Sequence, residues 1–183
     1  MSISAPEDGS HPSAAEIDAS ERRSAGVIGL LIVDDIPETV DYLSKLFGGE
    51  PDISVLGVAT NGDEAIEAAR RLRPDVVLLD HLMPVKYGID ATPHIIRDQP
   101  TVAVIIMSVL GDADTVERAM QAGASRFLVK PFSSAELMSA IRNPRGNAPV
   151  GRRDDAPQPA GTPARAGRGR RLATVIIRAV HRV

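Results

Sequence analysis

The sequence contains no cysteine and no tryptophan, and only 3% of its 183 residues are aromatic. Without cysteine, the chain can form neither a disulfide framework nor a thiolate zinc site, which is typical of proteins in a reducing compartment. No apolar run approaches the roughly 20 residues that cross a membrane. The N-terminus also lacks the basic-flanked apolar segment of a secretory signal. We therefore expect a soluble, cytoplasmic protein.

Charge and composition divide the chain into parts. Residues 1–143 hold 12 basic and 22 acidic residues, whereas residues 144–183 hold nine Arg and two Asp. An acidic body therefore carries a basic tail. Residues 1–26 are rich in Ser, Ala, Pro and charged residues and show no periodicity, so we predict a disordered leader there. A linker rich in Pro, Gly and Arg is predicted over 144–172, followed by a short apolar and basic tail of unknown role over 173–183.

Five short apolar runs alternate with helical periodicity between about residues 27 and 143. The runs are GVIGLLIVDD, DISVLGVATN, VVLLD, TVAVIIMS and SRFLVKP. Such non-alternating runs are typical of strands buried on both faces of a parallel sheet. Helices are predicted over 37–47, 62–73, 88–99, 112–123 and 134–143, and the third is the weakest because Pro93 is tolerated only in a first turn. We predict an α/β, flavodoxin-like (βα)5 three-layer sandwich with a parallel five-stranded sheet of order 2-1-3-4-5.

Polar residues follow four of the five predicted strands. They are Asp34 and Asp35, Asp80, Ser108 and Lys130. The carboxyl ends of parallel strands meet at one edge of a sheet, where open α/β folds bind their ligands. Taken singly, each residue has a structural explanation, such as a helix cap or an ordinary surface position. The arrival of polar groups from four strands at one edge favours a functional site.

The residue types at this edge indicate a chemistry. Close carboxylates repel each other unless a cation lies among them, and an all-oxygen cluster suits Mg²⁺. A magnesium ion beside a free carboxylate supports phosphoryl transfer to that carboxylate, which forms an acyl phosphate. Lys130 and Ser108 would then contact the phosphoryl oxygens. We expect no role for His81 beside Asp80, because neighbours along a strand point to opposite sides.

These motifs together resemble the CheY-like receiver domain of bacterial two-component response regulators. The resemblance covers about residues 27–143 and rests on LIVDD, VVLLDHLMP with its later glycine, MS and FLVKPF. It implies that Asp80 accepts a phosphoryl group from a histidine kinase. It also implies that Asp35 binds Mg²⁺ directly with Asp34 beside it, that Asp80 and the backbone carbonyl of Leu82 complete the ligands, and that the Lys130-Pro131 bond is cis.

The resemblance also implies how a signal leaves the domain. Ser108 and Phe127 would act as switch residues, although Phe127 is equally well explained by core packing. They would change the face of the fourth helix, fifth strand and fifth helix, about residues 112–142, for an unknown downstream protein or for a homodimer. Such a domain is a regulatory phosphoacceptor rather than an enzyme. We hypothesise that the apolar side chains of Leu82 and Leu110 shield the acyl phosphate from water.

The basic tail leaves several alternatives open. Forty residues of this composition contain no complete DNA-binding domain, so the tail is an extension of a single-domain receiver, a basic arm for nucleic acid or an acidic membrane, or part of a longer receiver-ATPase protein. No GxxxxGK[ST] motif supports ATP binding. A haloacid-dehalogenase-like phosphatase would need a second aspartate where Pro37 or Leu82 stands.

Overall fold

The computed structural model describes residues 19–146. The predicted linker and tail beyond residue 146, and the predicted leader before residue 19, lie outside the described residues. The strands are β1 (Ile28–Val33), β2 (Ile53–Ala59), β3 (Val76–Asp80), β4 (Ala103–Ser108) and β5 (Arg126–Val129). The helices are α1 (Ala19–Ser24), α2 (Pro37–Gly48), α3 (Gly62–Leu72), α4 (Gly88–Asp98), α5 (Ala113–Gln121) and α6 (Ser134–Arg142). No helix among residues 19–146 is long and apolar enough to span a membrane.

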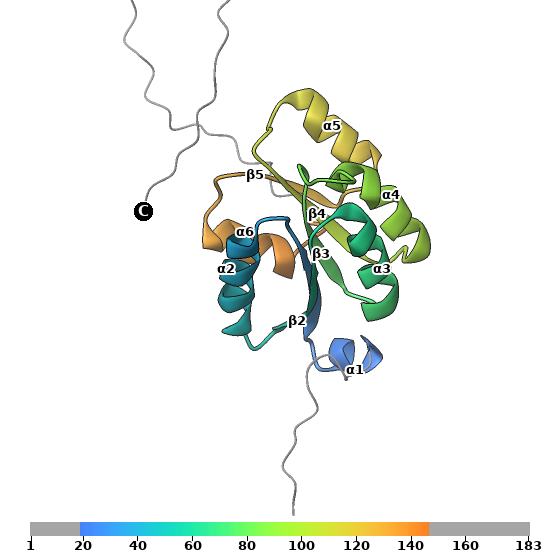
Figure 1. Ribbon diagram of the computed structural model, residues 1–183. Helices are drawn as coiled ribbons and strands as arrows, with labels where there is room; N and C mark the ends of the chain where they lie inside the picture. The colour runs from blue at the N-terminus through green and yellow to red at the C-terminus, as the bar shows by residue number, and fades with distance from the viewer. Residues whose placement is uncertain (1–18, 147–183) are drawn as a thin grey trace, which may run out of the picture. The chain divides into compact units, whose positions relative to one another are not determined.

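The strands form one parallel sheet with the predicted order β2-β1-β3-β4-β5. Figure 1 shows α2 and α6 on one face of this sheet and α3, α4 and α5 on the other. Each strand therefore separates two apolar layers, which explains why its sequence is apolar without alternation. The predicted flavodoxin-like class is confirmed.

Alternate residues of β1 illustrate how the two layers are built. Leu30 and Ile32 pack with the helices α2 and α6, whereas Leu31 and Val33 pack with α3, α4 and α5. All four side chains are 0% exposed. A fully buried aliphatic side chain stabilises a fold by about 1.5–3 kcal/mol. This burial holds the strand ends, and therefore the residues that follow them, in fixed positions.

Side-chain caps start three helices at the carboxyl edge of the sheet. Asn61 accepts hydrogen bonds from two backbone N–H groups of α3, and Asp112 accepts one from Thr115 in α5. Ser133 and Glu136 form the predicted capping box of α6. Each cap satisfies backbone donors that would otherwise lack partners.

The structure differs from the sequence prediction in the third predicted helix. Pro93 lies inside α4 and in its second turn, so the expectation of a first-turn proline is wrong. The helix continues because Ile89 and Ile95 are 4% and 1% exposed and anchor both turns in the core. The hydroxyl of Thr92 also donates to the Gly88 carbonyl at 2.9 Å. The free energy gained by burying these side chains thus exceeds the cost of the backbone hydrogen bond that proline cannot make.

The second difference is α1, which occupies part of the predicted leader. In Figure 1 it lies at the lower end of the sheet, beside the start of β1. Arg22 is only 4% exposed and donates to the carbonyl of Arg73 at 3.3 Å. Arg23 forms an ion pair with Asp75 at 2.5 Å. These contacts with the loop before β3 are non-local, which is why a periodicity argument predicts no helix here.

Candidate functional site

The strand ends deliver the predicted polar residues to one edge of the sheet. Asp34 follows β1, Asp80 and Ser108 end β3 and β4, and Lys130 follows β5. The sheet pairing continues past the strands, since the backbone N–H of Lys130 donates to the carbonyl of Ser108 at 2.8 Å. This extension fixes the stem of Lys130 beside β4. The Lys130-Pro131 bond is cis, as the resemblance implies.

Lys130 joins two carboxylates from different strands. Its Nζ lies 2.6 Å from Oδ1 of Asp80 and 3.0 Å from Oδ2 of Asp34. Asp34 is 1% exposed and Asp80 7% exposed. Two buried carboxylates in one place would repel strongly without a cation. The ammonium group of Lys130 supplies that cation.

Backbone groups hold the other oxygen of each carboxylate. The N–H of Leu82 donates to Oδ2 of Asp80 at 2.8 Å, and the N–H of Ile36 donates to Oδ1 of Asp34 at 3.0 Å. Gly88 lies directly behind this site, where an added Cβ would stand 2.1 Å from the carbonyl oxygen of Asp80. Only glycine fits at that position, which gives a physical reason for the glycine eight residues after Asp80.

Burial and pairing act in opposite directions on the two charged groups. Burial raises the pKa of Asp80, and the hydrogen bond from Lys130 only partly offsets this effect. Burial also disfavours charge on Lys130, but its hydrogen bonds to Asp80 and Asp34 outweigh burial and raise the Lys130 pKa. Lys130 is therefore a cation at neutral pH. Asp80 carries its negative charge at an energetic cost that an added cation would lower.

Ser108 and Phe127, the two predicted switch residues, are both buried. Ser108 is 1% exposed, and its Oγ accepts a hydrogen bond from the N–H of Leu110 at 3.0 Å. Phe127 is 2% exposed and belongs to the core layer beneath α3, α4 and α5. The position of Phe127 is the one that the core-packing explanation expects. Its role as a switch residue stays a prediction.

The structure brings two of the three predicted carboxylate ligands together, Asp34 and Asp80, and the metal roles of all three stay predictions. Within residues 19–146, no group of three or more Asp, Glu or His side chains is placed so that it could hold a metal ion. The carboxylate that meets Asp80 through Lys130 is Asp34, whereas Asp35 is half-exposed and has no hydrogen-bond or ion-pair partner in the described chain. Successive residues at a strand end point to different sides, which separates Asp34 from Asp35.

The oxygen donors at Asp34 and Asp80 nevertheless fit Mg²⁺. This ion retains several water ligands and is usually bound through one or two carboxylates together with substrate phosphates. Two converging carboxylates without nitrogen or sulfur donors match that preference. The site therefore fits Mg²⁺ as a partly hydrated ion rather than as a fully caged one.

The loops around Asp80 expose apolar side chains. Leu82 and Leu110 are each 41% exposed, and Val109 is 63% exposed. In the same β3–α4 loop, Val85 has a φ of 68°, a left-handed conformation that is strained for a β-branched residue. The N–H of Lys86 donates to the carbonyl of Pro84 at 2.8 Å across Val85, which closes a γ-turn. An ion pair of 2.6 Å between Lys86 and Asp63 ties this loop to α3.

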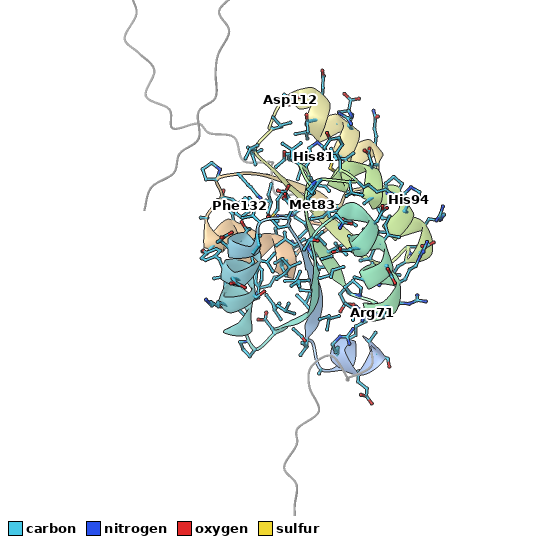
Figure 2. All side chains as sticks on the ribbon, in the orientation of Figure 1. Arg71, His81, Met83, His94, Asp112 and Phe132 are labelled. Carbon is cyan, nitrogen blue, oxygen red and sulfur yellow. The ribbon has the colours of Figure 1, made fainter. Side chains whose placement is uncertain are left out.

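Sequence reasoning gave His81 no role, and the structure places it in the protein interior. His81 is 4% exposed, and its ring lies 5.8 Å from the ring of Tyr87. Burial lowers its pKa, and the charge of Arg118 adds to that effect. Figure 2 shows His81 at the upper end of the sheet, near Asp112 at the start of α5. Its contacts are those of a packed side chain rather than of a base for Asp80.

The comparisons with known proteins agree with this geometry. The sequence model of the response regulator receiver domain matches residues 30–142, which is more than half of the chain. The chain therefore belongs to the response regulator receiver domain family. Domains of this family act as phosphoacceptors, generally bind Mg²⁺ at the phosphorylation site, and interact with histidine kinases and downstream effectors.

Individual relatives cover the same region. Chemotaxis protein CheY of Thermotoga maritima is 38% identical over 112 residues, which are 61% of this chain and 92% of that protein. The crystal structure of the response regulator domain of Thermotoga maritima CheB is 36% identical with a TM-score of 0.60, and the match covers 67% of this chain and 99% of that one. A CheX-CheY-BeF3-Mg complex from Borrelia burgdorferi is 30% identical with a TM-score of 0.60, over 65% of this chain and 90% of that one.

Other relatives are much longer than the shared region. The protein-glutamate methylesterase/protein-glutamine glutaminase 2 of Methanosarcina mazei is 41% identical over 107 residues, which are 57% of this chain but 29% of that protein. The transcriptional regulatory protein LnrK of Bacillus subtilis is 33% identical over 115 residues, 63% of this chain and 52% of that protein. The likeness therefore concerns the receiver domain and not the activities of these whole proteins.

Proposed function

We propose that this chain is a response regulator that receives a phosphoryl group on Asp80 from a histidine kinase. One observation carries the proposal: Lys130 bridges Asp80 and Asp34, two buried carboxylates from neighbouring strands, at 2.6 and 3.0 Å. A carboxylate that is buried, oriented and paired with a mobile cation suits nucleophilic attack on phosphorus. The carboxyl edge of an open parallel sheet is also where such chemistry is expected.

The transfer step uses the two oxygens of Asp80 differently. The N–H of Leu82 holds Oδ2, and Lys130 holds Oδ1. When an Asp80 oxygen forms a bond to phosphorus, the bond between phosphorus and the donor imidazole nitrogen breaks, and its electron pair leaves with the imidazole. Lys130 can then move from the carboxylate to a phosphoryl oxygen and remain charged. Ser108 can donate its hydroxyl hydrogen to another phosphoryl oxygen, because toward Leu110 its Oγ acts only as an acceptor.

The residues that would hold Mg²⁺ are Asp34, Asp35, Asp80 and the carbonyl of Leu82. When bound, the ion supplies positive charge that neutralises the phosphoryl group in transfer. Asp34 and Asp80 already converge through Lys130. In our proposal, the Asp35 carboxylate reaches the ion after its side chain rotates. Magnesium titration of Asp34→Asn and Asp35→Asn by calorimetry separates their roles, and unchanged affinity in both variants would remove them from the site.

The output that we propose is a shift in the packing of α5, β5 and α6. Ser108 links the site to this region, because its carbonyl accepts from the N–H of Lys130 after β5 and its Oγ accepts from the N–H of Leu110 before α5. A phosphoryl group that draws the Ser108 side chain toward itself would pull on the Leu110 loop through the hydrogen bond to Oγ. This change would be a population shift between two packings of α5, β5 and α6. A downstream protein or a second copy of the chain would bind one of the two packings.

The proposal is tested by exposure of the full chain to acetyl phosphate with Mg²⁺, followed by intact mass measurement. We expect a gain of one phosphoryl group that requires the metal and disappears when the metal is chelated. Asp80→Asn should abolish the gain, whereas Asp90→Asn, a matched change in α4 outside the site, should keep it. Phosphorylation of the Asp80→Asn chain to the wild-type extent would contradict the proposal.

A further inference from the structure

A second polar cavity lies at the opposite edge of the sheet, where the strands begin. It has a volume of about 350 Å³ and is lined by Ala19, Ser20, Arg23, Arg73, Gln99 and Thr101. Cavities that bind small molecules have volumes of roughly 300–1,000 Å³. One wall is α1, which precedes residues 30–142 matched by the receiver family. Part of the cavity is therefore built by residues outside the matched receiver region.

Arg73 gives this cavity an unbalanced positive charge. Its guanidinium forms no hydrogen bond or ion pair with any residue in 19–146, whereas Arg23 is paired with Asp75. Arg73 follows α3 with a φ of 48°, a left-handed conformation in which glycine or asparagine is usual. This conformation costs an arginine more backbone energy than it costs a glycine.

The floor of the cavity contains a buried amide with unused capacity. Gln99 is 5% exposed, and its Nε2 donates to the carbonyl of Pro74 at 2.6 Å. Its Oε1 is buried and accepts from no group among the described residues. Buried polar atoms without a partner are uncommon and call for an explanation. Thr101 adds a hydroxyl to the same lining.

We propose that this cavity binds a small anionic metabolite that carries a phosphate or carboxylate group together with hydroxyl groups. Arg73 would pair with the anionic group, because a guanidinium offers several donors to such oxygens. The Thr101 hydroxyl would meet the hydroxyls of the ligand. Because α1 forms one wall, the ligand would also hold α1 against the loop before β3. The proposal does not depend on phosphorylation at Asp80.

The test uses inorganic phosphate, citrate and ribose 5-phosphate, each titrated into the magnesium-free, isotope-labelled full chain while backbone amide shifts are recorded. We expect shifts centred on residues 19–24, 73–75 and 99–101 with at least one probe. Ribose 5-phosphate should bind more tightly than inorganic phosphate if hydroxyl contacts contribute, and citrate reports on a carboxylate ligand. Arg73→Gln should weaken the bound probe about tenfold or more.

Two controls separate this site from general attraction of anions. Arg71→Gln removes an arginine that is also unpaired within residues 19–146 and lies two residues earlier, in the last turn of α3, where it lines a different hollow with Glu64 and Glu67. Arg71→Gln should leave the affinity for the probe unchanged. Arg73→Gly suits the left-handed backbone, so this variant should stay folded but lose binding. The proposal is overturned if no probe shifts any amide signal. It is also overturned if Arg71→Gln weakens binding as much as Arg73→Gln does, or if the shifts are centred on Lys130.

Discussion

The two edges of the sheet treat their carboxylates differently. At the edge where the strands begin, Arg23 pairs with Asp75, Arg70 with Asp98, and Arg142 with both Asp52 and Glu50. At the edge where the strands end, one lysine serves both Asp34 and Asp80. Each of these four carboxylates thus has an arginine partner, whereas the two buried carboxylates at the other edge share a single lysine. Such an imbalance stabilises nothing by itself and suits a site that receives a cation and a phosphoryl group.

The pKa of Asp80 is shifted in the opposite direction from the pKa values of two arginine-paired carboxylates. The Arg142 hydrogen bond lowers the pKa of Asp52, and the Arg70 hydrogen bond lowers that of Asp98. At the other edge, burial raises the pKa of Asp80. Ionisation therefore favours the folded state at Asp52 and Asp98 and disfavours it at Asp80. Mutations placed in pairs, one at each edge, can test this contrast.

The largest expected effect comes from a methyl group added at each edge. Gly88→Ala places its Cβ 2.1 Å from the carbonyl oxygen of Asp80, a backbone atom held within β3. We expect a loss of about 3 kcal/mol or more in the free energy of unfolding. Gly29→Ala meets the side-chain ends of Leu56 and Arg22 at 2.8 and 3.0 Å, which can move, so about 1 kcal/mol is expected. Urea unfolding measures both, and equal losses would contradict the contrast.

The second prediction concerns pH and has opposite signs at the two edges. Because the folded-state pKa of Asp80 is raised above its unfolded value, ionised Asp80 costs stability at neutral pH. Asp80→Asn should therefore stabilise the chain at pH 7, with an advantage that shrinks as the pH falls through the folded-state pKa and is gone below the unfolded pKa.

Asp52→Asn is the matched variant at the other edge. The folded-state pKa of Asp52 is lowered by Arg142, so ionised Asp52 contributes stability above its unfolded pKa that is lost as the pH falls through the folded pKa. This variant should be less stable than the wild type at pH 7 and equal to it in strong acid. Urea unfolding between acid and neutral pH gives both comparisons, and the same sign for both variants would refute the division.

The third prediction tests the apolar shield around the phosphoryl group. Leu82→Asn and Leu110→Asn replace side chains that are each 41% exposed beside Asp80. Admission of water should shorten the lifetime of the phosphorylated chain about tenfold, which corresponds to about 1.4 kcal/mol of activation free energy. Met120→Asn changes an apolar side chain with 46% exposure on α5 and should leave the lifetime unchanged. If the lifetime of the phosphorylated chain is unchanged in both Leu82→Asn and Leu110→Asn, the shielding hypothesis is wrong.

The smallest expected effect is relief of strain in the β3–α4 loop. Val85→Asn puts a residue that tolerates the left-handed region at a φ of 68°, and should raise the free energy of unfolding by about 1 kcal/mol. Val109→Asn, also an exposed valine in a loop at this edge but without a positive φ, should change it little. A larger gain at Val109 than at Val85 would show that solvent exposure, and not backbone strain, is responsible.

Much of the site follows from the order of residues along the chain. Parallel strands bring their carboxyl ends to one edge, so Asp34, Asp80, Ser108 and Lys130 could be predicted to meet. The choice between Asp34 and Asp35 could not, because it depends on which side chain Lys130 reaches in three dimensions. The binding of Mg²⁺ by Asp34, Asp35 and Asp80 stays a prediction.

The fold shows the same limit of local reasoning. Apolar runs predict the five strands because burial on both faces leaves a continuous pattern. Helix α1 has only six residues and is held by Arg22 and Arg23 through contacts with the loop before β3. Pro93 is tolerated inside α4 because the core retains the turns on either side. In both cases, tertiary contacts determine a structure that local sequence signals disfavour or do not mark.

The most direct test of the account is to locate the phosphoryl group. The full chain is treated with acetyl phosphate and Mg²⁺, any acyl phosphate is reduced with borohydride to the stable alcohol, and the digested peptides are sequenced by tandem mass spectrometry. The account predicts that the altered residue is Asp80, beside Lys130, and that Asp34 and Asp35 are unchanged. Modification of Asp34, of Asp35 or of a carboxylate at the arginine-paired edge in place of Asp80 would contradict it.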